Sequence, residues 1–202
     1  MRELTTGPLP TPATAAQPTD ASLIQRILAG QTELYGQLVQ RHQQRISRFV
    51  ASYEHSVQEA QELTQETFLQ GFASLARFHG QAQFSTWLTG IALNLIRNHI
   101  GRNPGRRFVH LDISDCTDSV LCPESEEPEQ QQARKERLVA LTGALSTLAP
   151  EMREAIVLVV LQELSYQEAA QLLKVPPGTV KSRVCRARTQ LADALRPHIA
   201  DL

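Results

Sequence analysis

The segment VPPGTVKSRVCRARTQL, residues 175–191, places two prolines and a glycine directly before a helix-like pattern. Pro177 has a backbone φ suited to the first turn of a helix, and Gly178 allows another backbone or a phosphate to approach closely. Behind them, apolar residues recur at spacings of four, three and four: Val180, Val184, Ala187 and Leu191. This spacing is typical of the buried face of a helix, so we predict a helix that begins near Pro177.

A second helix is predicted just before this segment. The sequence SYQE, residues 165–168, fits a capping box in which Ser165 and Glu168 satisfy each other's backbone donors. The short helix that it opens carries Ala169, Ala170, Leu172 and Leu173, and Val175 can fill the turn that follows. A short helix, a tight turn and a basic second helix form a helix-turn-helix, whose second helix enters the major groove of DNA.

The polar side of the 175–191 helix carries the candidate DNA contacts near its N-terminal end: Lys181, Ser182, Cys185 and Arg186. Arginine bonds guanine through two hydrogen bonds, and a helix N-terminus favours phosphate. The alternative interpretation is an ordinary solvated helix face. The order of capping box, turn and basic helix favours DNA binding.

Four further helices are predicted in the N-terminal half. Residue 20 caps a short helix that Gly30 ends, a longer helix covers about 33–52, and SVQE at 56–59 is a capping box that opens a helix to about residue 76. We expect Phe72 on the inner face of that third helix. Ser85 is predicted to cap the fourth helix, about 86–100, with Trp87 and Phe84 as core anchors.

The C-terminal half contains a linker before its helices. Residues 112–129 hold seven acids and neither Lys nor Arg: Asp112, Asp115, Asp118, Glu124, Glu126, Glu127 and Glu129. Order returns with an apolar stripe that comprises Leu138, Leu141, Leu145 and Leu148, and Pro150 suits the first turn of the next helix. The sequence AIVLVVLQEL, residues 155–164, is apolar all round, so we expect that helix to form the buried centre of a domain.

The expected fold class is all-α, with two small helical domains joined by a flexible acidic linker. The boundaries are a disordered tail at 1–19, a first domain at 20–104, the linker at 105–133 and a second domain at 134–198. Charged residues make up 20% and the apolar class 42% of the chain, as in a folded, soluble protein. No apolar run reaches membrane-spanning length and no apolar signal core follows Met1, so a cytoplasmic location is the default expectation.

Catalytic and metal chemistry are not expected. We find no nucleophile–base set, no paired carboxylates and no glycine-rich phosphate cradle, so the protein is predicted not to be an enzyme and to need no cofactor. His110, Cys116 and Cys122 are irregularly spaced in the linker, which argues against a metal site. Cys185 lies beside the cationic Arg183 and Arg186, so a redox role stays open, although a small residue facing a groove is the simpler interpretation.

Two blocks resemble a known family. LAPEMREAIVLVVLQELSYQEAAQLLKVPPGTVKSRVCRARTQL, residues 148–191, closely resembles region 4 of extracytoplasmic-function sigma factors, which form group 4 of the bacterial sigma-70 family. QELTQETFLQGFASLARFHGQAQFSTWLTGIALNLIRNHI, residues 61–100, resembles their region 2. The resemblance implies a dissociable initiation subunit that gives core RNA polymerase its promoter preference.

The resemblance also implies roles for individual residues. In region 4, which reads the −35 element, it places Lys181, Ser182, Cys185 and Arg186 at bases and Thr179 and Arg183 near phosphates. In region 2, it assigns capture of an unstacked −10 base to the loop that contains Phe78, His79, Gly80, Gln81, Gln83 and Ser85. Contacts to the upstream −10 duplex are assigned to Asn94, Arg97 and Asn98. Docking on the β′ clamp helices is assigned to Glu59, Glu62, Gln65, Glu66 and Leu69.

Further partners follow from the resemblance. The β flap of polymerase and an anti-sigma factor are implied, without membrane insertion. Many family members carry an Arg near position 90, where this chain has Gly90. Two other interpretations stay open at the level of sequence: a helix-turn-helix regulator that acts without polymerase, and an adaptor that would not need Lys181 or Arg186.

Overall fold

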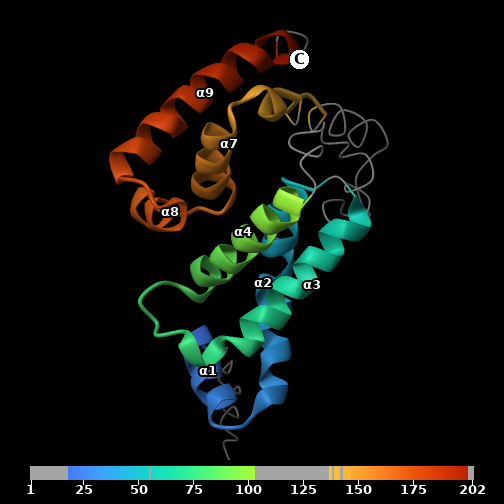
Figure 1. Ribbon diagram of the computed structural model, residues 1–202, viewed down its shortest axis with the longest axis vertical. Helices are drawn as coiled ribbons and strands as arrows, with labels where there is room; N and C mark the ends of the chain where they lie inside the picture. The colour runs from blue at the N-terminus through green and yellow to red at the C-terminus, as the bar shows by residue number, and fades with distance from the viewer. Residues whose placement is uncertain (1–17, 55, 103–136, 138, 142, 200–202) are drawn as a thin grey trace, which may run out of the picture.

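The computed structural model describes residues 18–54, 56–102, 137, 139–141 and 143–199, and within these ranges it contains helices and turns but no β-strand. The all-α prediction is therefore confirmed. Figure 1 shows α1 to α4 in one half of the molecule and α7 to α9 in the other. The proposed tail up to residue 17 and the proposed linker, with His110, Cys116 and Cys122, lie outside the described residues.

The first half consists of α1 (Asp20–Leu28), a short 3-10 turn η1 (Thr32–Leu34), α2 (Tyr35–Ala51), α3 (Val57–Ala73), a second 3-10 turn η2 (Leu75–Arg77) and α4 (Phe84–Arg102). Helices α2, α3 and α4 pack against one another in pairs. The side chains that fill the space between the helices are fully buried: Leu23, Leu38, Ile46, Phe49 and Leu88. These residues come from the apolar stripes of their helices, as burial of one helix face requires.

Two helix starts differ from the predictions. Thr19, not Asp20, caps α1, and Asp20 instead bonds Arg41 at 2.9 Å and His42 at 2.7 Å. Helix α4 begins at Phe84, so Ser85 lies inside the first turn and is buried. In both cases the observed start differs from the predicted one by a single residue. Local sequence specifies the end of a helix only to within one or two residues.

The capping box predicted at the start of α3 is half formed. The Ser56 hydroxyl accepts a hydrogen bond from the Glu59 backbone at 3.3 Å, as expected. The Ser56 backbone N–H, however, donates to Glu54 Oε1 at 3.2 Å, so the carboxylate two residues before the cap takes the place predicted for Glu59. Ser56 therefore caps the helix, while the Glu59 side chain extends toward α4.

Residues of both α2 and α4 lie close to the α3 backbone at Gly71. A Cβ atom at this position would lie 2.9 Å from both Leu88 Cδ1 and Tyr35 Oη, so only glycine fits without movement of these neighbours. The Tyr35 hydroxyl donates to the Phe68 carbonyl at 2.7 Å, and burial raises the pKa of Tyr35 to about 12. Phe72, predicted on the inner face, is instead 43% exposed and packs its ring against Tyr35 at a centroid distance of 4.9 Å.

The second half is formed by α7 (Pro150–Ile156), a single π-helical turn η4 (Val157–Leu161), α8 (Tyr166–Leu173) and α9 (Pro177–Ile199). Residues 139–141 and 143–147 are helical as well, and buried Arg153 holds this segment through a 2.8 Å bond from Nε to the Leu145 carbonyl. Pro150 occupies the first turn of α7, which confirms the prediction from sequence.

The segment 155–164 is less buried than its composition predicts. Ala155, Val157 and Leu158 are buried, but Val160 is 54% and Leu161 41% exposed. The segment therefore contributes to the buried centre of this half as predicted, except at Val160 and Leu161, where the prediction is wrong. The neighbouring helices leave the last apolar residues of the π turn, Val160 and Leu161, exposed.

The two halves touch directly. Helix α4 of the first half lies beside α7 and α8 of the second in Figure 1, and one continuous apolar cluster contains buried residues from both halves. At Gly90 on α4, an added Cβ would meet Leu172 Cδ2 of α8 at 2.9 Å. No described helix combines the length and apolar character needed to cross a membrane.

Candidate nucleic-acid and partner interfaces

The helix-turn-helix begins with a complete capping box. The Ser165 hydroxyl accepts from the Glu168 backbone at 3.2 Å, and Glu168 Oε2 accepts from the Ser165 backbone at 2.9 Å. These hydrogen bonds stabilise the ionised carboxylate, so they lower the pKa of Glu168, first through the backbone and then through the hydroxyl of Ser165. The start of α8 is thereby fixed, as the sequence predicts.

The turn between α8 and α9 is built on a left-handed residue. Lys174 has φ 56° and ψ 43°, and the Val175 backbone N–H bonds back to the Ala170 carbonyl at 3.1 Å. The carbonyl of Pro176 then accepts the Thr179 backbone N–H at 2.9 Å, and Pro177 begins α9. The direction of α9 relative to α8 is therefore set by backbone hydrogen bonds around two prolines.

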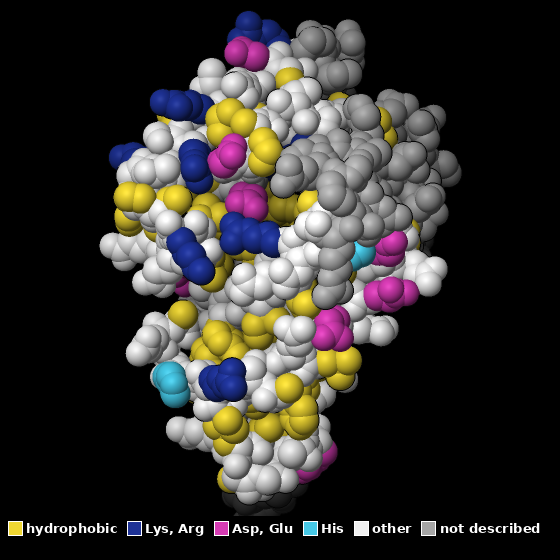
Figure 2. All heavy atoms as spheres, in the orientation of Figure 1, with side chains coloured by type: hydrophobic (Ala, Val, Ile, Leu, Met, Phe, Trp, Pro, Cys, Tyr) yellow, Lys and Arg dark blue, Asp and Glu magenta, His cyan; other side chains and the backbone are white. Residues whose placement is uncertain are grey.

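Helix α9 separates its residues into the two faces that the spacing predicts. Val180, Val184 and Ala187 are buried against α7 and α8. The predicted base contacts are all exposed: Lys181, Ser182, Cys185 and Arg186. Thr179 and Arg183 are half-buried beside them. In Figure 2, most Lys and Arg side chains on the visible face lie over the half that contains α7 to α9.

The loop between η2 and α4 contains the predicted base-capturing residues. His79, Gly80, Gln81 and Gln83 are exposed, and Gly80 has φ +69°. Phe78 is half-buried, with its ring against Trp87 at 5.3 Å and Phe84 at 5.8 Å. Phe84 is buried as expected of a core anchor, whereas Trp87 is only partly covered. Ser85 is 5% exposed and belongs to the first turn of α4 rather than to the exposed part of the loop.

The three predicted duplex contacts on α4 differ in environment. Asn94 and Asn98 are exposed. Arg97 is engaged by the other half of the molecule: its Nη2 lies 3.0 Å from Glu154 Oε2, and its Nε donates to Glu154 Oε1 at 3.3 Å. The three side chains therefore share one helix, but one of them is already paired with a carboxylate on α7.

The outer face of α3 is polar and partly acidic. Glu62, Gln65 and Glu66 are exposed, and Leu69 is 65% exposed among them. Gln58 and Gln70 bond the carboxylates of Glu62 and Glu66 one turn away, at 3.1 and 3.0 Å. Figure 2 shows Asp and Glu side chains on the side where Figure 1 places α3. Glu59 departs from this face because its carboxylate turns toward α4.

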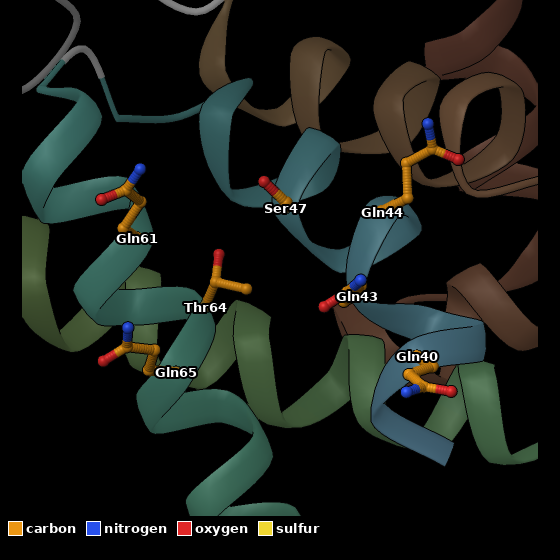
Figure 3. A pocket seen from close by; sticks show the side chains of 7 residues that line it. All are labelled: Gln40, Gln43, Gln44, Ser47, Gln61, Thr64 and Gln65. Carbon is orange, nitrogen blue, oxygen red and sulfur yellow. The ribbon is translucent and has the colours of Figure 1, made fainter. Parts of the chain in front are cut away.

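A groove that the sequence analysis did not identify runs between α2 and α3. At one end it is mainly apolar, has a volume of about 750 Å³ and includes Tyr35, Val39, Phe68, Leu69 and Phe72. At the other end, with a volume of about 550 Å³, amide and hydroxyl side chains line it: Gln40, Gln43, Gln44, Ser47, Gln61, Thr64 and Gln65 (Figure 3). Gln43, Thr64 and Gln65 belong to both ends, so the groove is continuous along the α3 face.

Three ionisable residues that the sequence analysis left apart meet at the ends of three helices. His99 Nε2 on α4 lies 3.2 Å from Glu54 Oε2 and 3.5 Å from Glu59 Oε2. A protonated His99 can pair with both carboxylates, and the same three groups offer ligand atoms within 4.8 Å of one another. Residues 54, 59 and 99 have no regular spacing, so no sequence signal would have joined them.

Gln162 is a further residue that the sequence analysis did not identify. It follows the π turn, its backbone N–H bonds the Val157 carbonyl at 3.0 Å, and its side chain is fully buried against the first half of the molecule. Arg45 and Thr89 both donate to Gln162 Oε1 at 3.2 Å, and Gln162 Nε2 donates to the Arg45 carbonyl at 3.3 Å. A second Arg45 nitrogen bonds the Gln162 carbonyl. The only sequence signal is one amide directly after an apolar run.

Comparisons with family profiles match both halves of the molecule. Residues 38–105 match the profile described as Sigma-70 region 2, and residues 138–191 match that of Sigma-70, region 4. The first match covers α2 to α4 with the loop before α4, and the second covers the helix-turn-helix.

Characterised relatives are similar along nearly their whole length. RNA polymerase sigma-H factor of Pseudomonas aeruginosa is 31% identical over 185 residues, which cover 90% of this chain and 96% of the relative. ECF RNA polymerase sigma-E factor of Escherichia coli K12 is 30% identical over 187 residues, 91% of this chain and 97% of the relative.

Two solved structures share the fold. CnrH, solved in complex with the cytosolic domain of CnrY, has a TM-score of 0.64 at 24% identity and covers 87% of this chain and 96% of its own. The sigma factor RpoE of Bartonella quintana, solved with the anti-sigma factor NepR, has a TM-score of 0.62 at 26% identity, with 80% and 96% covered.

Proposed function

Because this chain belongs to the extracytoplasmic-function group of the sigma-70 family of RNA polymerase sigma factors, we propose that it binds core RNA polymerase and directs initiation at specific promoters. A sigma factor is an initiation factor and not an enzyme, so the polymerase supplies the chemistry. Every step assigned to this chain is therefore a binding step, and the compartment in which it acts is the cytoplasm, where polymerase and promoter DNA are found.

Duplex reading of the −35 element is assigned to α9. The observation that carries this assignment is the exposed polar face in the first turns of α9, on a helix-turn-helix whose cap and turn are fully hydrogen-bonded. Lys181 and Arg186 supply the charged donors, with Ser182 and Cys185 between them. Thr179 and Arg183, which are half-buried, are assigned to phosphate contacts. Such contacts position a helix in the groove without reading the sequence.

Recognition of the −10 element is assigned to the loop before α4. His79, Gly80, Gln81 and Gln83 present backbone and polar groups to solvent, and these can hold one unstacked base. The half-buried pair of Phe78 and Trp87 forms an aromatic floor beside the loop. Ser85 supports the loop from the first turn of α4, and Asn94, Arg97 and Asn98 are assigned to the duplex upstream of the melted base.

Docking on core polymerase is assigned to the outer face of α3 together with the neighbouring groove. Glu62, Gln65 and Glu66 provide polar and acidic groups for the β′ clamp helices, and exposed Leu69 continues into the apolar end of the groove. Glu59 contributes by holding the end of α3 against α4 through His99. The β flap and an anti-sigma factor complete the proposed set of partners.

Run-off transcription with purified core polymerase and a promoter library tests the proposal. The wild-type chain is expected to yield promoter-specific products, and K181A/R186A is expected to lose them while it still binds core. E62K/E66K is expected to lose core binding. R196A, which removes a basic residue from the far end of α9, is the matched control and should behave as wild type. Absence of any promoter-specific product with the wild-type chain would overturn the proposal.

E62K/E66K also separates the proposal from a polymerase-independent regulator. Such a regulator would keep its full activity after this charge reversal, because only the α9 face would then matter. Retention of transcriptional activity by E62K/E66K would therefore contradict the sigma role.

A further inference from the structure

The cluster of Glu54, Glu59 and His99 lies where three helices begin or end. Glu54 follows the last turn of α2, Glu59 belongs to the first turn of α3, and His99 lies in the last turn of α4. From His99 Nε2 the distances are 3.2 Å to Glu54 Oε2 and 3.5 Å to Glu59 Oε2. Among the residues that the structure describes, no other set of His, Cys, Asp and Glu side chains brings three ligand atoms together in this way.

The Nε2 atom of His99 distinguishes this cluster from an ordinary ion pair. It is buried, and it makes no hydrogen bond although two carboxylate oxygens lie within 3.5 Å. The ring nitrogen therefore does not point along the line to either oxygen. A buried polar atom without a hydrogen bond is costly, and a cation placed between the three groups would satisfy it.

The spacing of the three atoms corresponds to that of ligands around one ion. Zinc binds histidine nitrogen and carboxylate oxygen at about 2.0–2.2 Å in tetrahedral geometry. Two such ligands are about 3.3–3.5 Å apart, and the ion lies away from the line that joins them. Both distances from His99 Nε2 agree with this spacing, and so does the indirect orientation of the nitrogen.

Ser56 holds the two carboxylates in position. Its backbone N–H donates to Glu54 Oε1 at 3.2 Å, while the other oxygen of that carboxylate faces His99. Its hydroxyl accepts the Glu59 backbone N–H at 3.3 Å and thereby fixes the first turn of α3. Carboxylates that bind metals are themselves hydrogen-bonded, which orients them toward the ion. The half-formed capping box therefore places Glu59 toward His99 instead of toward Ser56.

Charge and exposure also suit a divalent cation. When His99 is neutral, two carboxylates place two negative charges beside one imidazole nitrogen. The Glu54 side chain is 10% exposed, and those of His99 and Glu59 are 26% and 27% exposed. The cluster is therefore shielded enough to strengthen the attraction for a cation, and open enough for the ion to enter and keep a water ligand.

We propose that Glu54, Glu59 and His99 form a binding site for one zinc ion, with water in the fourth position. A ligand set of imidazole and carboxylates favours zinc over Mg²⁺ and Ca²⁺, which prefer oxygen ligands alone. The ion connects the end of α2, the beginning of α3 and the end of α4, so its binding stabilises the first half of the molecule. This role requires neither polymerase nor DNA and goes beyond the function proposed above.

Zinc affinity of the purified full chain, stripped of metal and titrated against a zinc-sensitive dye, tests the site directly. H99Q and E54Q are each expected to bind zinc at least about tenfold more weakly than wild type, because even a change outside the ligand set costs about 10–100-fold in affinity. H79Q and E33Q are matched controls, because both side chains are exposed and lie outside the cluster, and their zinc affinity should equal that of wild type. Equal affinity of wild type, H99Q and E54Q would overturn the site.

Thermal unfolding separates loss of the site from loss of the fold. The Tm of wild type is expected to rise by about 5–10 °C at a free zinc concentration about 100-fold above Kd. H99Q and E54Q should unfold cooperatively without metal, and the same zinc concentration should leave their Tm unchanged. An equal rise in the Tm of wild type with Mg²⁺ would overturn the assignment of the ion.

Co²⁺ in place of zinc identifies the kind of ligand. Because no cysteine belongs to the site, wild type with one Co²⁺ bound is expected to show no charge-transfer absorption from a thiolate. A thiolate band at this stoichiometry would overturn the proposed ligand set. None of these measurements involves polymerase, so failure of the wild-type chain in transcription would contradict the proposed function alone.

Discussion

Arg97 and Glu154 lie on helices of different halves and form an ion pair with two contacts, 3.0 Å between Nη2 and Oε2 and 3.3 Å between Nε and Oε1. Both side chains are partly shielded, with 38% and 24% of their surface exposed. A two-point geometry and partial burial make such a pair stronger than an ordinary surface pair. The coupling free energy between these two side chains therefore reports how stable the contact between α4 and α7 is.

A double-mutant cycle of R97Q and E154Q is expected to give a coupling free energy of roughly 0.5–1 kcal/mol in urea unfolding, reduced in 1 M salt. The control is the pair of Arg196 and Asp193 on α9, which is 79% and 63% exposed and should show almost no coupling. Equal coupling in the two cycles would contradict a stable contact between the halves.

The capping box of α8 should make stability depend on pH. The folded-state pKa of Glu168 is lowered below its ordinary 4.5, so the ionised carboxylate contributes stability above that value and the contribution disappears as the pH falls through the lower folded pKa. We expect E168Q to cost about 1 kcal/mol at pH 7 and progressively less below pH 4.5, as measured by urea unfolding at several pH values. E66Q, on the exposed face of α3, serves as control. A cost that stays constant down to pH 3 would contradict this assignment.

Glu163 adopts φ +50°, a backbone conformation that residues other than glycine rarely adopt. E163G should remove this strain and raise stability by roughly 1 kcal/mol, or a few degrees in Tm for a domain of this size. Q171G, an exposed position within α8, should instead lower stability by about 1 kcal/mol. Thermal unfolding of both variants distinguishes the effect of backbone conformation from that of glycine itself. Similar losses in the two would show that residue 163 carries no strain.

Gly71 should not accept a side chain. G71A would push against Leu88 and Tyr35 at 2.9 Å, and we expect a loss of about 1–3 kcal/mol in the free energy of unfolding. G101A, on α4 where nothing is near, should be neutral or stabilising by up to about 1 kcal/mol. Denaturant unfolding decides between them, and a G71A variant as stable as G101A would show that the three helices are not held this closely.

Local structure followed from sequence where neighbours along the chain decide it. The capping box at Ser165, the helix start at Pro177 and the buried stripe of Val180, Val184 and Ala187 all depend on residues within one or two turns. Caps and periodicity act over this range, so the sequence carries them directly. Helix ends were the weak point, as Thr19 and Ser85 show, because adjacent residues compete for the same cap.

The periodicity of a helix predicts which face is apolar, but it does not predict which other segment covers that face. Phe72 belongs to an apolar stripe but lies at the edge of α3, where only Tyr35 covers it. Glu59 matches a capping box, yet His99, forty residues later, draws its carboxylate away.

By itself, the sequence determined that this protein is a pair of helical modules, one of them a helix-turn-helix with an exposed basic face. The tertiary structure decided that the modules close on each other through Gln162, that Gly90 provides the room and that Arg97 is paired with Glu154. The physical reason is range: a helix forms from contacts within four residues, whereas burial of one amide among Arg45 and Thr89 requires segments more than seventy residues apart to meet.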